Sequence, residues 1–385
     1  MRMDELDASR FTLTTNGHEA DSLKAYWDAL DLDLAAVADL DLTRSAQPID
    51  GDALFTLYLR TVESVGDALH DLLDTEQLAD LAKKTYIWDD DDQSSDHWRP
   101  QGISGTSAAY DEGTLDGRNI QVVSWHYAED EGGFDKGARV TFIDHTGWTN
   151  KTTPAELPYK HVLLVCPDFD LSANLVSFAP CSGESRFGQV HAGGVVWYNR
   201  YLYVADTDQL LVFDTRRIKR IEGSEAELDE DQDERRCGWT GRRYAALGYR
   251  YVIPVVRVYV ANEPSNWDDD KFKPFSTVSL ERDGDTRRLV CARYVTDTAE
   301  VDKAVVLFFD FDNACALEGW KDGEVVATEA WRSNLDHVKG VFAKENTLWF
   351  ARSNVNKPTR RSKKQNGSGR DCCGPAGGRH PKEMA

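Results

Sequence analysis

The sequence predicts an all-β fold that repeats one strand-rich unit. The segment His191–Asp206 (HAGGVVWYNRYLYVAD) recurs near the C-terminus as His337–Arg352 (HVKGVFAKENTLWFAR). In both copies a glycine stands three positions after the histidine, and a leucine stands eight positions after the glycine. A weaker third copy starts around Gly102 and leads into an apolar strand that ends near His126. A glycine followed by two apolar strands is typical of the start of one blade of a β-propeller.

Strand-length apolar runs follow one another from Trp98 onward, and they group into blades. The three repeat glycines, at 102, 194 and 340, are separated by 92 and 146 residues, which is about two and three blade-sized periods. That spacing allows five blades with long loops, or six. We predict five, because each block has its own set of strands: Gln101–Cys166, Ala192–Asp214, Arg243–Tyr259, Phe275–Ala330 and the unit that opens at His337.

Two segments flank the propeller, which is expected over residues 98–353. Residues 1–90 are predicted to be helical, because an apolar stripe with helical spacing runs from Leu23 to Leu34 and others follow over 54–73 and 76–84. The tail, residues 354–385, is basic and glycine-rich, and no strand is predicted in it. The last blade would then lack its outer strands, unless an N-terminal strand at Arg10–Thr14 completes it. The tail is either a flexible extension or sequence foreign to the fold.

The charge of the chain argues against some classes of partner. The 385 residues carry a net charge of −21, with a pI near 4.8, so nucleic acid and anionic membranes would be repelled. Much of the acid lies in the aspartate-rich runs 89–92, 229–231 and 268–270. Calcium binding and a solvated acidic surface both suit such runs. We favour the surface, because none has the alternating spacing of an EF-hand loop.

The cysteines and the N-terminus bear on the compartment. Seven scattered cysteines show no zinc-site spacing. Cys166 and Cys291 lie in apolar strands and are expected to be small buried hydrophobes, although a Cys166–Cys181 disulfide would suit an exported protein. Acidic residues stand where a signal peptide would be basic and apolar. As written, the chain is expected to be a soluble, cytoplasmic monomer.

Several strand motifs together carry a family resemblance. They are Pro100–Ser104, Val122–His126, Arg139–Asp144, Lys160–Val165, His191–Gly194 and Leu202–Thr207. Together they resemble uncharacterised β-propeller proteins of actinomycetes, most of them exported, and more distantly the NHL and SMP-30-like propellers. The resemblance implies a propeller over roughly 98–353, in a group of folds that includes binding modules, lactonases and lyases. The chain departs from it in its N-terminus and its tail.

The residues that precede the repeat glycines are candidates for catalysis or metal binding. His191 and His337 take equivalent places in two blades, and Gln101 stands just before Gly102 in a third. Two imidazoles facing one funnel, with Asp336 or Asp206, could hold a divalent metal ion or supply a general base. The alternative is that the repeat histidine bonds a neighbouring blade and stabilises the ring.

Aromatic side chains offer a second kind of site. Trp98 and Trp267 lie in polar loops, where an indole can stack on a sugar or another flat ligand. We expect them to bind a ligand together with Gln101, Trp125 and His126. The alternative is that these rings only fill the space between blades.

Two functions follow from these patterns. The first is a propeller that binds a small molecule or glycan at the funnel face of its channel. The second is a metal-dependent hydrolase or lyase centred on His191 and His337. No Gly-x-Ser-x-Gly elbow, phosphate loop or dinucleotide fingerprint is present in the sequence, so we favour the binding protein.

Overall fold

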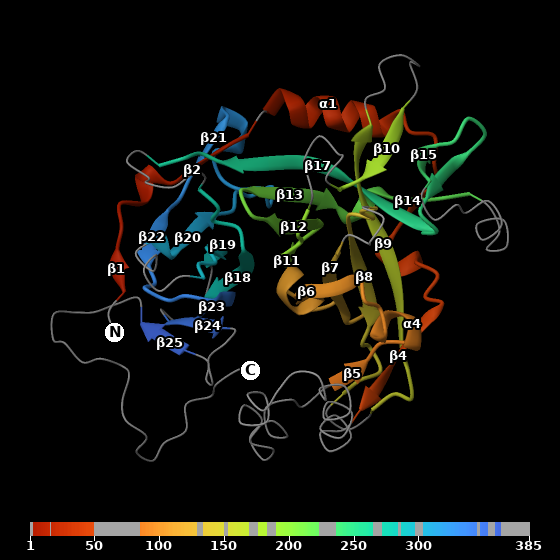
Figure 1. The fold of residues 1–385 in the computed structure, drawn as a ribbon, viewed down its shortest axis with the longest axis horizontal. Coiled ribbons are helices and arrows are strands. Elements are labelled where there is room, and N and C mark those ends of the chain that lie inside the picture. The colour runs from red at the N-terminus through yellow and green to blue at the C-terminus, as the bar shows by residue number, and fades with distance from the viewer. Residues whose placement is uncertain are drawn as a thin grey trace.

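The computed structural model describes most of the chain. The described residues are 3–15, 17–49, 85–128, 134–149, 153–168, 176–182, 190–222, 236–264, 272–283, 286–296, 303–344, 347–352 and 359–362. Strands predominate among them, which confirms the prediction of a mostly β protein (Figure 1). No helix in these ranges is long and apolar enough to cross a membrane.

An eight-stranded sheet forms the larger half of the fold. Its first half is an antiparallel meander of β6 (Trp98–Gly105), β7 (Ile120–Tyr127), β8 (Ala138–Asp144) and β9 (Leu157–Asp168). Its second half contains β11 (Gly194–Tyr198), β12 (Tyr201–Asp206), β13 (Gln209–Asp214) and β17 (Tyr251–Ala261). A short parallel pairing of β17 with β9 joins the halves, and the edge strands β6 and β11 lie side by side, so the sheet is nearly closed and barrel-like (Figure 1).

The repeat glycines explain why β6 and β11 can approach so closely. A Cβ atom on Gly102 would lie 2.5 Å from the Cα atom of Gly194, and one on Gly194 would lie 2.7 Å from the backbone nitrogen of Val278. Any side chain at these two positions would therefore push neighbouring strands apart. Glycine suits positions 102 and 194 because the backbones of neighbouring strands are in direct contact there.

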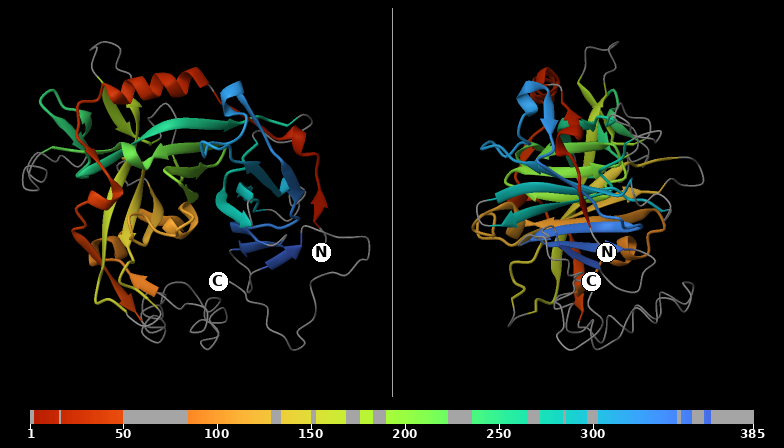
Figure 2. Two further views of the ribbon diagram at one scale, coloured as in Figure 1. Left: turned by 180° about the vertical axis from the view of Figure 1, so that it is seen from behind. Right: turned by 90° about the vertical axis from the view of Figure 1, so that its left-hand side faces the viewer.

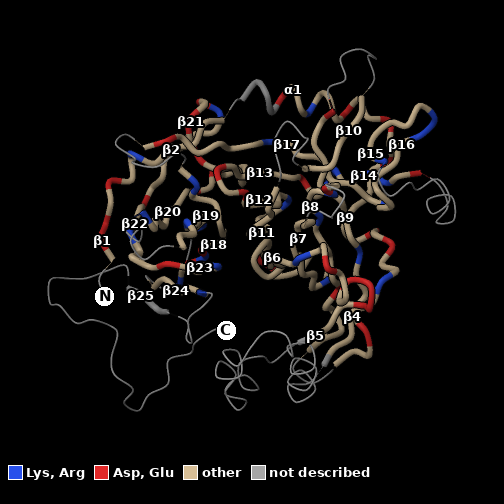
Figure 3. The backbone as a smooth tube through the Cα atoms, viewed as in Figure 1, with Lys and Arg blue, Asp and Glu red and all other residues tan. Residues whose placement is uncertain are grey.

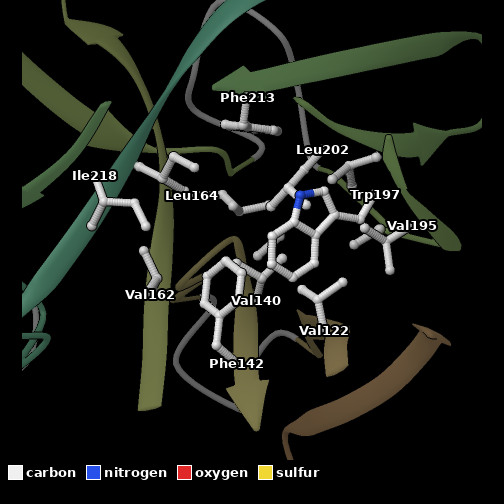
Figure 4. Close-up of a cluster of buried hydrophobic side chains, with 14 of the residues drawn as sticks. Val122, Val140, Phe142, Val162, Leu164, Val195, Trp197, Leu202, Phe213 and Ile218 are labelled. Atoms are coloured by element: carbon white, nitrogen blue, oxygen red, sulfur yellow. The ribbon is translucent and has the colours of Figure 1, made fainter. Parts of the chain in front are cut away.

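Alternate side chains of seven of the eight strands, all but β6, fill the inside of this sheet. Trp197 of β11 contacts Phe142 of β8 edge to face, with ring centroids 5.6 Å apart. Leu164 of β9 and Phe213 of β13 belong to the same buried cluster (Figure 4). The two halves are thus held together by apolar contacts as well as by the pairing of β9 with β17.

Two smaller sheets continue the arrangement. One contains β18 (Thr277–Asp283), β19 (Thr286–Ala292), β20 (Val305–Asp310), β22 (Glu329–Arg332) and β1 (Asp4–Glu5). The other contains β23 (Val338–Lys344), β24 (Thr347–Arg352) and β25 (Thr359–Ser362). The first strands of the four groups are neighbours in order, because β6 packs beside β11, β11 beside β18, and β18 beside β23.

The N-terminal residues pack and pair with strands that come later in the chain. Helix α1 (Gly17–Asp28) lies along the outside of β17, as the view from behind in Figure 2 shows. Four early strands pair with later ones: β1 with β22, β2 (Thr12–Thr14) with β17 and β21 (Glu324–Val326), β3 (Leu34–Ala35) with β14 (Ile218–Arg220), and β4 (Arg44–Ile49) with β9 and β5 (Thr85–Ile87). The remaining named elements are short: α4 (Asp90–Gln93), α5 (Thr106–Ala109), β10 (Ser177–Pro180), β15 (Cys237–Trp239), β16 (Tyr244–Ala246) and the 3-10 turns Ala8–Arg10, Val37–Asp39, Thr215–Arg217 and Trp320–Asp322.

The expected N-terminal helix is shorter than its apolar stripe. Leu23, Trp27 and Leu30 are buried as expected, but Leu34 lies in strand β3 and is exposed. The helix ends at Asp28, and aspartates follow at 31 and 33. Negative charge is unfavourable at a helix C-terminus, which explains the early end. The helices expected over 54–73 and 76–84 fall outside the described residues.

The third expected blade does not form a sheet of its own. Its main strand, β17, pairs with β13 and completes the second meander, while β15 and β16 form a separate hairpin. Two other expectations are also corrected. Arg10–Thr14 does not complete the last group, because β2 pairs with β17 and β21, and residues after 352 do supply a strand, β25, which pairs with β24.

Cys166 and Asp92 make specific bonds that a buried hydrophobe and a solvated acidic surface would not make. Cys291 is buried with a free thiol, as predicted, whereas Cys166 forms a disulfide with Cys181. The run 89–92 is not simply a solvated surface, since the side chain of Asp92 is buried in an ion-pair network. Acidic residues lie along the backbone near β4 (Figure 3). The other two acidic runs lie outside the described residues.

Candidate functional site

Two histidines from neighbouring meanders meet at one rim of the eight-stranded sheet. His126 is near the end of β7, and His191 lies three residues before the start of β11. Their ring centroids are 5.4 Å apart, with the rings at 66° to each other. The His191 side chain is exposed and that of His126 is half-buried. The Nδ1 atom of His126 is buried and, among the residues that the structure describes, has no hydrogen-bond partner.

His126 is neutral near pH 7. Burial, together with the nearby His191 and Arg99, lowers the pKa of His126 to about 4, against an opposing effect of Asp135. A neutral imidazole offers one N–H donor and one nitrogen acceptor. The uncharged imidazole of His126 can therefore act either as a hydrogen-bond donor or as an acceptor toward a ligand at the rim.

A buried carboxyl group, that of Asp206, lies next to this pair. Asp206 ends strand β12, where the chain turns into β13 through Thr207 in a left-handed conformation. Its Oδ1 atom accepts a hydrogen bond of 3.0 Å from the backbone N–H of His191, the one hydrogen bond that the described residues give this side chain. Its exposed fraction is 2%, and burial raises the pKa of Asp206 to about 7.

His337 occupies the corresponding place before β23, but its neighbours differ. Its ring packs edge to face against Tyr294, at 5.8 Å, and its Nδ1 atom lies 3.5 Å from a carboxylate oxygen of Asp336. Asp336 is in turn bound by Arg352. Because β18 lies between β11 and β23, His337 sits in a different inter-meander contact from His191.

The described residues do not assemble the expected metal site. Within the ranges given above, no three His, Cys, Asp or Glu side chains lie together in a way that could hold a metal ion. His191, His337 and Asp336 therefore do not form a three-ligand set.

Two of the tryptophans expected to bind a ligand, Trp98 and Trp125, instead hold a protein cation. The guanidinium of Arg139, on β8, lies 4.3 Å from the ring of Trp98 and 4.7 Å from that of Trp125. Trp125 is 1% exposed, and its ring also packs against Trp88. A ligand has no access to the face of Trp125, so the stacking role expected of that residue is corrected.

Of the two other expected ligand-binding residues, Gln101 and Trp267, the structure describes Gln101. Gln101 is exposed and lies in the irregular stretch of β6 between Pro100 and Ile103, near the rim. Trp267 falls outside the described residues.

A polar cluster that no motif of the sequence indicated lies behind the two tryptophans. Arg139, Tyr159 and His161 point to one side of β8 and β9, where they bind the carboxylate of Asp92. The available signal was a charged residue inside an otherwise apolar strand, ARVTFID, because a buried arginine needs an anionic partner.

Comparisons with known proteins add no assignment. No protein-family model matches the chain, and no curated protein sequence matches it. The proposals below depend on the geometry of the rim and of the Asp92 cluster.

Proposed function

We propose that the protein is a β-propeller that binds a small polyhydroxylated molecule or a glycan at the rim where His126 and His191 meet. The propeller assignment is supported by the order of the four strand groups, whose first strands β6, β11, β18 and β23 are consecutive neighbours. In propellers the innermost strands of successive blades are neighbours in this way around the channel. It is also supported by the glycines at 102 and 194, which make the close contacts between successive groups.

The observation that carries the binding function is the unpartnered Nδ1 atom of His126. A buried polar atom without a hydrogen bond costs about 1–3 kcal/mol, so a ligand that supplies the missing bond is favoured. A sugar hydroxyl can both donate and accept, which suits a neutral imidazole in either tautomer. The exposed ring of His191, 5.4 Å away, gives such a ligand a second polar contact.

Asp206 supports the same choice of ligand. Its carboxyl group has a raised pKa because it is buried, so Asp206 itself is largely uncharged below about pH 7. An uncharged polar ligand therefore meets less electrostatic repulsion here than the overall charge of −21 implies. The metal-dependent hydrolase or lyase has no comparable support among the described residues. A monomer that binds no nucleic acid and no membrane stays our prediction.

The test is an NMR titration of protein with isotope-labelled histidines, using a panel of neutral mono- and disaccharides. We expect a binding sugar to shift the imidazole signals of His126 and His191 but not those of His337. The variant His126→Ala should weaken that sugar by about fivefold, the value of one hydrogen bond. His337→Ala is the matched control, since that histidine takes the same repeat position elsewhere. A sugar that binds equally well to His126→Ala would refute the assignment of the site.

A further inference from the structure

The carboxylate of Asp92 is bound by donors from three strands. Its Oδ1 atom accepts a 2.6 Å bond from Nη2 of Arg139, and its Oδ2 atom accepts 2.6 and 2.7 Å bonds from Oη of Tyr159 and Nε2 of His161. Arg44, on β4, adds a 3.3 Å contact from Nη1. The side chain of Asp92 is 5% exposed. These donors surround a single carboxylate as completely as a ligand site would.

Contacts that do not involve Asp92 hold two of the donors in place. Arg139 lies between the rings of Trp98 and Trp125, and its Nη1 atom donates a 3.2 Å bond to Oη of Tyr249. Thr141 bonds the Nδ1 atom of His161 at 2.7 Å. Since a carboxylate only accepts, the proton of neutral His161 is on Nε2 and points at Asp92. The receptor is therefore built by the meander β6–β9 and its neighbours.

This receptor has more donors than Asp92 uses. The Nε atom of Arg139 and the Nε1 atom of Trp125 are both buried, and neither has a hydrogen-bond partner among the described residues. Asp92 itself comes from α4, a helix of four residues. The occupant of this binding face is thus one side chain of a short element.

We propose that the outer face of β6–β9 is a carboxylate-binding site that the chain fills with its own Asp92, and that it binds a free carboxylate when that side chain is withdrawn. A carboxylate ligand and α4 then compete for the same place. Arg139 and His161 are the main recognition groups. The rings of Trp98 and Trp125 hold the guanidinium of Arg139 in place. This site is independent of the rim at His126.

The test removes the internal carboxylate and supplies a free one. In the full-length variant Asp92→Ala, the missing group has the size of formate. We expect sodium formate to raise the thermal unfolding midpoint of this variant saturably, relative to sodium chloride at equal ionic strength. At a formate concentration ten times its Kd, the folding equilibrium constant should rise about 11-fold. Wild-type protein should show no difference between the two salts, because Asp92 fills the site.

Two further variants make the result decisive. Asp91→Ala is the matched control, because Asp91 belongs to the same helix, its side chain is 85% exposed, and it lies 3.7 Å from Arg44; it should not respond to formate. The double variant Asp92→Ala/Arg139→Met should lose the formate effect. If Asp92→Ala does not fold in chloride, its refolding yield in formate becomes the measurement, and recovery there supports the proposal. The proposal is overturned if formate acts equally on Asp91→Ala, or if Asp92→Ala neither gains stability nor refolds in formate.

Discussion

The substitution Asp206→Asn should make the protein more stable at neutral and alkaline pH. Asp206 is 2% exposed, and the one hydrogen bond that its side chain receives in the described structure comes from the backbone N–H of His191. The oxygen of an asparagine amide can accept that same bond in nearly the same volume. The change therefore removes the titration of the group and little else.

The size and direction of the effect follow from the pKa. Burial raises the pKa of Asp206 from 3.8 to about 7, so the folded protein holds a proton that the unfolded chain has lost over this interval. Where the folded state binds more protons than the unfolded state, stability falls as the pH rises. The shift corresponds to an upper limit of about 4 kcal/mol at about pH 8, and we expect about 2–4 kcal/mol after the site relaxes.

Urea unfolding of both proteins across the pH range measures this difference. Below about pH 3 the carboxyl is protonated in both states, so the two proteins should have similar free energies of unfolding. The advantage of Asp206→Asn should then grow up to about pH 8, with unchanged m-values. A difference that does not vary with pH, or a wild type that is the more stable protein at about pH 8, would show that the ionised carboxylate is stabilised in the fold and would refute the reasoning.

Two further predictions concern the architecture. Gly194→Ala should lower the free energy of unfolding by about 1–3 kcal/mol, because its Cβ atom would lie 2.7 Å from the backbone nitrogen of Val278. Gly340→Ala should change it by less than about 0.5 kcal/mol, because the new atom meets one side-chain methyl at 3.3 Å. Denaturant melts of both variants check this pair, and equal losses would contradict it. Reduction of the Cys166–Cys181 disulfide, which spans 15 residues, should cost about 3 kcal/mol. Melts with and without reductant test this, with Cys166→Ala/Cys181→Ala as the variant that should not respond.

The strands were predictable where the signal is local. The motifs Val122–His126, Arg139–Asp144 and Leu202–Thr207 match β7, β8 and β12 within a residue or two, because alternation and turns act over a few positions. The partner of β17 could not be predicted in this way, since its parallel pairing with β9 joins segments about 90 residues apart. The same limit applies to the Asp92 cluster, where a carboxylate of helix α4 meets side chains from three distant strands.

The repeat predicted the positions of His191 and His337 but not their chemistry. In each case the histidine precedes the first strand of a meander and packs against a ring at the end of the second strand of another one: His126 for His191, and Tyr294 for His337. This recurrence favours a role in packing for the repeat histidine itself. The two contacts differ in the ring that the repeat histidine meets. His126, on β7, has a buried nitrogen without a hydrogen-bond partner among the described residues. The face of the Tyr294 ring is instead covered by Lys339, whose Nζ atom lies 4.3 Å from the ring centroid. A function at this rim should therefore depend more on His126 than on either repeat histidine, and His191→Phe, which keeps the ring contact, should retain more ligand affinity than His126→Phe.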